Sequence, residues 1–207
     1  MSNNNEEVEE EEIKVILVGE PGTGKTSLIN VSVGAKFQEN TQSTLLSTFV
    51  QKKIDKNGKN YILNIWDTAG QEKYHAVTKI FIKNSKIVVL VYAINNKESF
   101  KGLQTYWYKT LKDALGEAPV FGMVGNKSDL FLNEEVKENE AMEFANEKEM
   151  KYKLVTAKNN PEGFIAFLNE LLDQYIQQNE VVPKRDTIFI EKDNNNNNKK
   201  VKKKCCK

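Results

Sequence analysis

The chain of 207 residues is long enough for one globular domain with a sizeable core and flanking segments. Its 30 basic and 29 acidic residues nearly cancel, but residues 1–12 carry six Glu and no basic residue, whereas residues 199–207 carry six Lys and no acidic one. The remainder holds 24 basic and 23 acidic residues, so we expect no broad basic face for nucleic acid. The basic C-terminus suits an anionic membrane surface or an acidic partner, or simply solubilises that segment.

Several targeting and anchoring signals are missing from the sequence. It has no apolar run of the 18 or so residues that a membrane span requires. The acidic, Asn-rich N-terminus is unlike a signal peptide, and Ser2 excludes N-myristoylation. The two cysteines, Cys205 and Cys206, are adjacent and would make a poor disulfide staple, so we expect an intracellular, reduced protein.

The first elements follow from hydrophobic patterning. Residues 1–12 are expected to be disordered, because their mutually repelling carboxylates have nothing to bury. The apolar run at residues 13–18 predicts a buried strand, which a Gly-rich turn connects to a helix near residues 25–33. The polar, Thr- and Ser-rich residues 35–47 predict a loop.

Strand and helix patterns then alternate. Strands at residues 49–54 and 61–66 flank Asn57-Gly58, a pair typical of a hairpin turn. Further strands are predicted at residues 86–94, 119–124 and 152–156, and helices at residues 98–115, 134–149 and 162–177. The order predicts an α/β fold with a six-stranded, mostly parallel sheet, one antiparallel strand and helices on both faces. Residues 13–178 would form this domain, and residues 179–207, which include Asn194–Asn198, a flexible tail.

A phosphate-binding motif lies between the first predicted strand and helix. Residues 19–26 read Gly-Glu-Pro-Gly-Thr-Gly-Lys-Thr and match the P-loop motif G-x-x-x-x-G-K-[ST] in full. These eight residues are called the P-loop below. Its backbone N–H groups and the helix N-terminus would face a polyphosphate. Lys25 would reach the β- and γ-phosphates, and the Thr26 hydroxyl would ligate Mg²⁺.

A second motif, Asp67-Thr68-Ala69-Gly70-Gln71, follows the second strand of the hairpin. Asp67 ends the predicted strand, where a carboxylate facing the P-loop is the expected magnesium partner, although alone it could equally cap a helix. Gly70 lacks a Cβ, so its N–H could approach a γ-phosphate. Gln71 carries an acceptor and two donors on a short arm, which suits orienting a water molecule for in-line attack.

A base-recognition site is predicted at the same sheet edge. Asn126-Lys127-Ser128-Asp129 follows the strand at 119–124, and Thr156-Ala157-Lys158 follows the last strand. The Asp129 carboxylate can accept hydrogen bonds from both N1–H and the 2-amino group of guanine, a pair of donors that adenine lacks. The motif is weak alone, because such residues populate loops generally, and becomes specific behind a complete P-loop.

Together these motifs resemble the Ras superfamily of small GTPases over residues 13–178. The resemblance implies that Thr44 ligates Mg²⁺ when the γ-phosphate is present and that Phe37 packs against guanine. The catalytic residues would be Gln71 and Lys25, and the metal ligands Thr26, Thr44 and Asp67. The implied nucleotide-binding set is Gly19, Glu20, Pro21, Gly22, Thr23, Gly24, Lys25, Thr26, Ser27, Phe37, Thr44, Asp67, Gly70, Asn126, Lys127, Asp129, Thr156, Ala157 and Lys158.

Within the superfamily the chain is most similar to the Rab branch, through WDTAGQEKY, VVLVYAINNKESF and the Cys-Cys ending. That resemblance implies prenylation of Cys205 and Cys206 and attachment to the cytoplasmic face of an endomembrane or vesicle, with a cytosolic pool. It also implies an exchange factor, a GTPase-activating protein, effectors and a prenyl-binding chaperone as partners of a monomer. The departures are residues 45–49 (LLSTF), Ala93, Lys73 and Pro21, and Pro21 removes an N–H beside the γ-phosphate.

Alternatives follow from these departures. Gln71 favours a switch that hydrolyses GTP slowly, whereas Pro21 leaves open a guanine-nucleotide-binding scaffold with little hydrolysis. A P-loop kinase or ATPase is a third reading, disfavoured by the base motif. His75 is expected to be a surface residue without a metal role, since it lacks co-ligands. Of Tyr106, Trp107 and Tyr108, one or two are expected to lie in the core and the rest at the surface.

Overall fold

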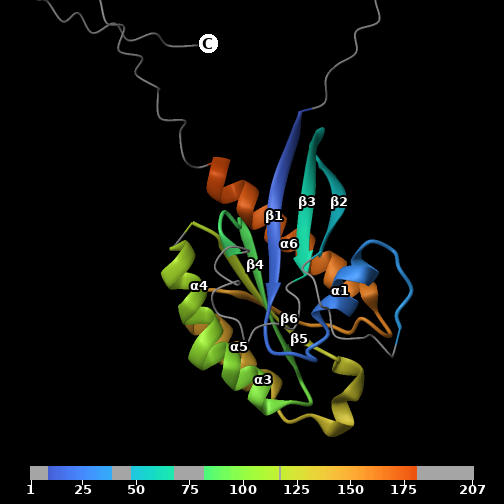
Figure 1. Cartoon of the computed structure of the whole chain (residues 1–207), viewed down its shortest axis with the longest axis vertical. Helices are drawn as coiled ribbons and strands as arrows, with labels where there is room; N and C mark the ends of the chain where they lie inside the picture. The colour runs from blue at the N-terminus through green and yellow to red at the C-terminus, as the bar shows by residue number, and fades with distance from the viewer. Residues whose placement is uncertain (1–8, 39–47, 68–81, 117, 181–207) are drawn as a thin grey trace, which may run out of the picture.

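The computed structural model describes residues 9–38, 48–67, 82–116 and 118–180. Six strands form one sheet in the order β2-β3-β1-β4-β5-β6 (Figure 1). The strands are β1 (Glu10–Val18), β2 (Thr48–Lys56), β3 (Lys59–Asp67), β4 (Ile87–Ala93), β5 (Val120–Asn126) and β6 (Lys151–Leu154). Only β2 runs antiparallel to its neighbour, which confirms the predicted mixed sheet.

Alternating side chains divide the core into two layers. Ile13, Val15 and Leu17 of β1 pack with α1 (Lys25–Ser32) and α6 (Pro161–Glu180) on one face. Ile16 and Val18 point to the other face, where α3 (Lys97–Gly102), α4 (Tyr108–Leu115) and α5 (Glu138–Glu147) cover the sheet. Because both faces are covered, all seven residues of β4 are buried and apolar, as expected for a central parallel strand.

The predicted hairpin places Asp67. Asn57 and Gly58 both have positive φ, 56° and 80°, as a two-residue type I′ turn requires. Pairing continues from Lys56↔Lys59 to Thr48↔Asp67, so the register of the whole hairpin follows from the turn. It ends with Asp67 at the edge where β1 also ends, next to the P-loop.

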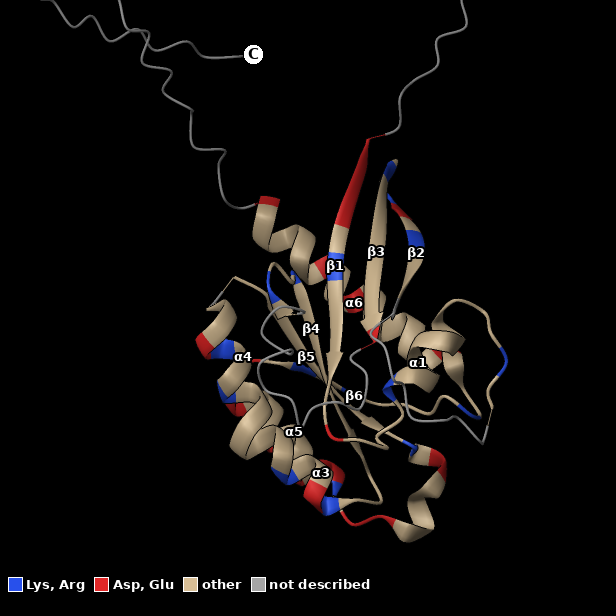
Figure 2. Ribbon diagram, viewed as in Figure 1, with Lys and Arg blue, Asp and Glu red and all other residues tan. Residues whose placement is uncertain are grey.

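The start of β1 corrects the predicted disorder of residues 1–12 for Glu10–Glu12, whereas residues 1–8 lie outside the described residues. Strand β1 begins at Glu10, and Glu10–Glu12 pair with Asn60–Ile62 of β3. Lys59 forms ion pairs with Glu9 and Glu11, so β3 supplies the positive charge that the N-terminal segment lacks (Figure 2). Partners far along the chain therefore extend the strand into an acidic run.

Three predicted helices also need correction. The helix expected at 134–149 forms only over Glu138–Glu147, after the 3₁₀ helix η2 (Ser128–Asn133), because the N–H groups of Glu135 and Val136 donate to the carbonyl of Ile94. The helix at 98–115 contains a π-helical turn, η1 (Leu103–Trp107). Helix α6 extends the helix predicted at 162–177 to Glu180, past the predicted domain end at residue 178, and Asn179 Nδ2 donates to the Tyr175 carbonyl at 2.7 Å.

The loops after the parallel strands gather at one edge of this sheet. The P-loop follows β1, and the two base motifs follow β5 and β6. This edge is where α/β proteins bind their ligands. Across the described ranges, no helix is both long and apolar enough to cross a bilayer.

Candidate nucleotide-binding site

The turn from β1 into α1 has the conformation that a phosphate cradle needs. Gly24 immediately precedes α1 with φ +87°, a left-handed conformation that favours glycine. A Cβ at Gly24 would lie 2.3 Å from Nδ2 of Asn126, so a side chain is excluded on steric grounds as well. No side chain caps α1, and its first turn contains no acidic residue. The N-terminus of this helix is therefore suited to an anion.

Carbonyl groups of the P-loop orient the Lys25 side chain. It is 6% exposed, and its Nζ donates to the carbonyls of Gly19 at 2.7 Å and Glu20 at 3.1 Å. Two carbonyl acceptors hold the ammonium inside the loop rather than in solvent. The predicted phosphate ligand thus lies where a polyphosphate wrapped by Gly19–Thr26 would meet it.

Thr26 and Asp67 are brought together from two elements 41 residues apart. The Thr26 hydroxyl on α1 donates to Asp67 Oδ2 at 2.7 Å, and Asp67, at the end of β3, is 3% exposed. A carboxylate and a hydroxyl beside the predicted phosphate site are hard oxygen ligands of the kind Mg²⁺ uses together with phosphates and water. The donor set therefore fits the magnesium ion that the family resemblance implies, even though no group of three or more His, Cys, Asp or Glu side chains gathers as a metal site anywhere in the described ranges.

Asn126 links the base motif to the P-loop. It is the last residue of β5, 2% exposed, and its Nδ2 donates to the carbonyl of Thr23 at 2.7 Å. Thr23 is itself fixed, because its hydroxyl donates to the Glu20 carbonyl at 2.9 Å. The loops that would hold the phosphates and the base thus form one hydrogen-bonded unit.

The two base motifs also hold each other. The Thr156 hydroxyl donates to Asp129 Oδ1 at 2.6 Å and accepts from the N–H of Lys158 at 3.1 Å. The N–H of Ser128 donates to the Val155 carbonyl, and Lys127 adopts a left-handed conformation with φ 64°. These contacts orient the Asp129 carboxylate at the sheet edge, and its pairing with guanine stays a prediction.

The remaining predicted residues fall into two groups. Pro21 and Gly22 are exposed on the loop, Ser27 lies in the first turn of α1, and Ala157 is buried. Phe37 is partly buried against the core around α1 and α6, and its contact with guanine stays a prediction. Thr44, Gly70, Gln71, His75, Cys205 and Cys206 lie outside the described residues.

One polar contact with the P-loop was not anticipated. Trp107 is 1% exposed, Tyr106 and Tyr108 are partly buried, and so the mixed core and surface prediction for this aromatic set is confirmed. However, the Trp107 indole N–H also donates to Glu20 Oε1 at 3.1 Å. The aromatic run gave no signal for a partner 87 residues away.

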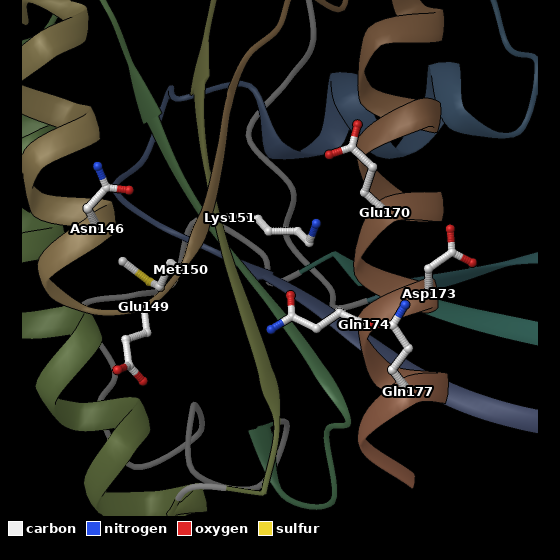
Figure 3. Close-up of a pocket in the computed structure, with 8 residues that line it drawn as sticks. All are labelled: Asn146, Glu149, Met150, Lys151, Glu170, Asp173, Gln174 and Gln177. Atoms are coloured by element: carbon white, nitrogen blue, oxygen red, sulfur yellow. The ribbon is translucent and has the colours of Figure 1, made fainter. Parts of the chain in front are cut away.

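A separate pocket of about 430 Å³ is lined by residues other than those of the predicted site (Figure 3). Asn146, Met150 and Lys151 line one side of it, and Glu170, Asp173 and Gln174 of α6 line the other. Glu170 pairs with Lys153 and Asp173 with Lys56, at 2.8 Å in each case. The pocket sits where β6 begins rather than where it ends, so it is no part of the nucleotide site.

Sequence comparisons agree with this geometry. Residues 14–201 match the model of the Ras family. Ras-related protein Rab-21 of Geodia cydonium is 37% identical over 80% of this chain and 72% of its own length, and human Rab-21 is 36% identical over 81% and 74%. Human Rab-4A is 33% identical over 83% of this chain and 79% of its own length. The chain therefore belongs to the Ras family of small GTPases, as a divergent Rab-like member.

Proposed function

We propose that this chain is a molecular switch that binds GDP and GTP, hydrolyses GTP slowly and recruits effectors to a membrane, in vesicle trafficking. One observation supports the proposal above all. The P-loop, the Thr26–Asp67 pair and both base motifs lie at one sheet edge, where Asn126 bonds Thr23 and Thr156 bonds Asp129. This arrangement supports the proposal, because it places candidate partners for the phosphates, the metal ion and the base along one edge.

Each side chain has a physical role in the proposed reaction. Lys25 and the N–H groups of the P-loop bind the β- and γ-phosphates and offset the charge that spreads over the phosphate oxygens. Thr26, Thr44 and Asp67 would hold Mg²⁺, which would supply further positive charge to offset that of the phosphates. Gln71 would orient the attacking water molecule. No arginine motif is apparent in the sequence, so stimulated hydrolysis is expected to use a finger from an activating protein, worth about 10³–10⁵ in kcat.

The C-terminal tail supplies the proposed membrane attachment. Cys205 and Cys206 would both carry geranylgeranyl groups, because one lipid chain binds a membrane only marginally and two anchor stably. The six lysines of residues 199–207 would add attraction to an anionic leaflet, roughly 1 kcal/mol each when close to the surface. Exchange factors, effectors and a prenyl-binding chaperone are proposed partners of the same switch.

Single-turnover hydrolysis of GTP by the purified protein tests the proposed activity. We expect slow basal turnover that falls further in Gln71→Leu, because a leucine cannot orient water. Pro21→Gly should change the rate stimulated by an activating protein more than the basal rate, since Pro21 is exposed on the loop.

Equal rates in the wild type and in Gln71→Leu would contradict the switch. In that case tight binding of GTP without turnover would favour the second candidate, a guanine-nucleotide-binding scaffold, which the exposed Pro21 in the P-loop supports.

A further inference from the structure

A buried tryptophan contacts the P-loop directly from the helical layer, which consists of α3, η1, α4 and α5. The indole N–H of Trp107 donates to Glu20 Oε1 at 3.1 Å, and the Trp107 side chain is 1% exposed in the core between the sheet and α3–α5. Glu20 is the second residue of the phosphate-binding motif. Its side chain is thus held toward the helical layer.

Two features of the helical layer accommodate this contact. Trp107 ends the π-helical turn η1, in which the N–H of Tyr108 donates to the carbonyl of Leu103 five residues earlier. Such turns are rare, and they cluster at functional sites. One turn upstream, a Cβ on Gly102 would lie 2.6 Å from Glu20 Oε1 and 3.0 Å from Cγ. Glu20 therefore packs against a helix position that has no side chain.

The backbone of the same glutamate orients the phosphate ligand. Its carbonyl accepts from Lys25 Nζ at 3.1 Å and from the Thr23 hydroxyl at 2.9 Å. A change in the Glu20 conformation would therefore reach both Lys25 and Thr23. In addition, a carboxylate that swung toward the phosphates would repel them, because like charges at short range are unfavourable.

We propose that Trp107 is a positioning residue for the nucleotide: its indole N–H holds the Glu20 carboxylate away from the phosphates and fixes the carbonyl that orients Lys25. The inference rests on the proposed function, because it concerns retention of a guanine nucleotide. It makes the junction between η1 and α4 a determinant of nucleotide lifetime, although no residue there would contact the nucleotide.

The test is the dissociation rate of a fluorescent GDP analogue in a mutant cycle. Trp107→Phe keeps an aromatic ring but removes the donor, and it should accelerate release by about tenfold, as expected for a lost hydrogen bond to a charged group. In a Glu20→Ala background the same substitution should have little effect, because no carboxylate remains to be released. Trp66→Phe removes the other tryptophan of the chain and is the matched control, with release as in the wild type.

The salt dependence of nucleotide release distinguishes a positioning role of Trp107 from general damage to the core. The acceleration caused by Trp107→Phe should shrink as ionic strength rises from about 0.05 to 0.5 M, because repulsion between a partly exposed carboxylate and phosphate is screened. Equal acceleration in the Glu20 and Glu20→Ala backgrounds, at every salt concentration, would overturn the proposal in favour of simple core damage.

A second experiment, the NMR spectrum of the indole N–H groups, tests the same contact without nucleotide kinetics. It keeps the proposal testable if Trp107→Phe does not fold. The Glu20→Ala variant should shift the indole N–H resonance of Trp107 and speed its hydrogen exchange, whereas that of Trp66 should not change. Unaltered resonances would overturn the inference. If the wild type itself failed to retain GDP, the proposed function would fail, and this spectrum would still decide whether Trp107 holds Glu20.

Discussion

At the residue scale, the hydrogen bond from Thr156 to Asp129 determines which atom of residue 129 faces the base. The Thr156 hydroxyl donates to one oxygen of the Asp129 carboxylate at 2.6 Å. In Asp129→Asn, the amide oxygen would keep that hydrogen bond, which turns the NH₂ group toward the base. A donor would then stand where an acceptor is needed for guanine.

We therefore expect Asp129→Asn to weaken GTP binding by about ten- to a hundredfold, the cost of leaving polar groups mispaired, and to improve binding of xanthosine triphosphate. Equilibrium titration with both nucleotides measures this change. Asp113→Asn, at an exposed position of α4, controls for the loss of one negative charge. Unchanged GTP affinity in Asp129→Asn would show that the base is read elsewhere.

Sequence patterns could predict residues whose role depends on neighbouring residues along the chain. Gly24, Lys25 and Thr26 belong to one continuous motif whose conformation is local. The Trp107–Glu20 contact was not predictable, because the two residues are 87 positions apart and meet only through the packing of a helix against the P-loop. Asn126 lies between these cases: its motif was predicted, but its hydrogen bond to Thr23 emerges only when β1 and β5 share a sheet.

At the element scale, α6 shows how closely helix and sheet are packed. A Cβ on Gly122 of β5 would lie 2.8 Å from Cδ2 of Leu171 and 2.9 Å from Cζ of Phe167. Both α6 side chains are fully buried. The glycine lets the helix approach the strand, and the two side chains fill the space that it leaves.

Leu171→Ala should accordingly lower the free energy of unfolding by about 2–5 kcal/mol, because it removes buried methyl groups and leaves a cavity. Leu132→Ala is the matched control: Leu132 is 86% exposed, and its truncation should change stability by less than about 0.5 kcal/mol. Urea unfolding at one fixed GDP concentration compares the variants, since bound ligand shifts apparent stability. Similar losses in both variants would contradict this description of the core.

Element types were predicted better than element boundaries. Every predicted strand formed, because buried apolar runs and the Asn57-Gly58 turn are strong local signals. The helix predicted from Glu134 does not form at its start, because the N–H groups of Glu135 and Val136 donate to the carbonyl of Ile94, just after β4. The π-helical turn was not predicted; it ends at Trp107, whose indole N–H bonds Glu20 of the P-loop.

At the scale of the whole molecule, Glu11 joins β1 to α6. Its carboxylate accepts from Tyr175 of α6 at 2.9 Å and pairs with Lys59 of β3 at 2.9 Å. Burial raises the pKa of Glu11, but hydrogen bonds from Lys59 and Tyr175 outweigh burial and hold that pKa below its ordinary value of 4.5. Burial raises the pKa of Tyr175 to about 12, so this hydroxyl remains a donor.

A lowered pKa in the folded state means that ionised Glu11 favours folding. This contribution is fully present above pH 4.5 and is lost as the pH falls through the lower folded-state pKa. The stability difference between wild type and Glu11→Gln should therefore be constant near neutrality and shrink below pH 4.5. Unfolding titrations across that window measure it, with Glu143→Gln on α5 as an exposed control. A difference that persisted unchanged at low pH would rule out the ionised carboxylate as its source.

The same contacts fix where the two ends of the described domain leave it. Tyr175 lies beside Glu11, so α6 finishes near the edge where β1 starts, and the nucleotide loops follow the opposite ends of the strands. Strand β1 has nine residues, a length of about 30 Å at roughly 3.3 Å per residue. A fluorophore attached just before β1 or just after α6 would therefore sit about one strand length from a labelled nucleotide. That separation suits energy-transfer measurements.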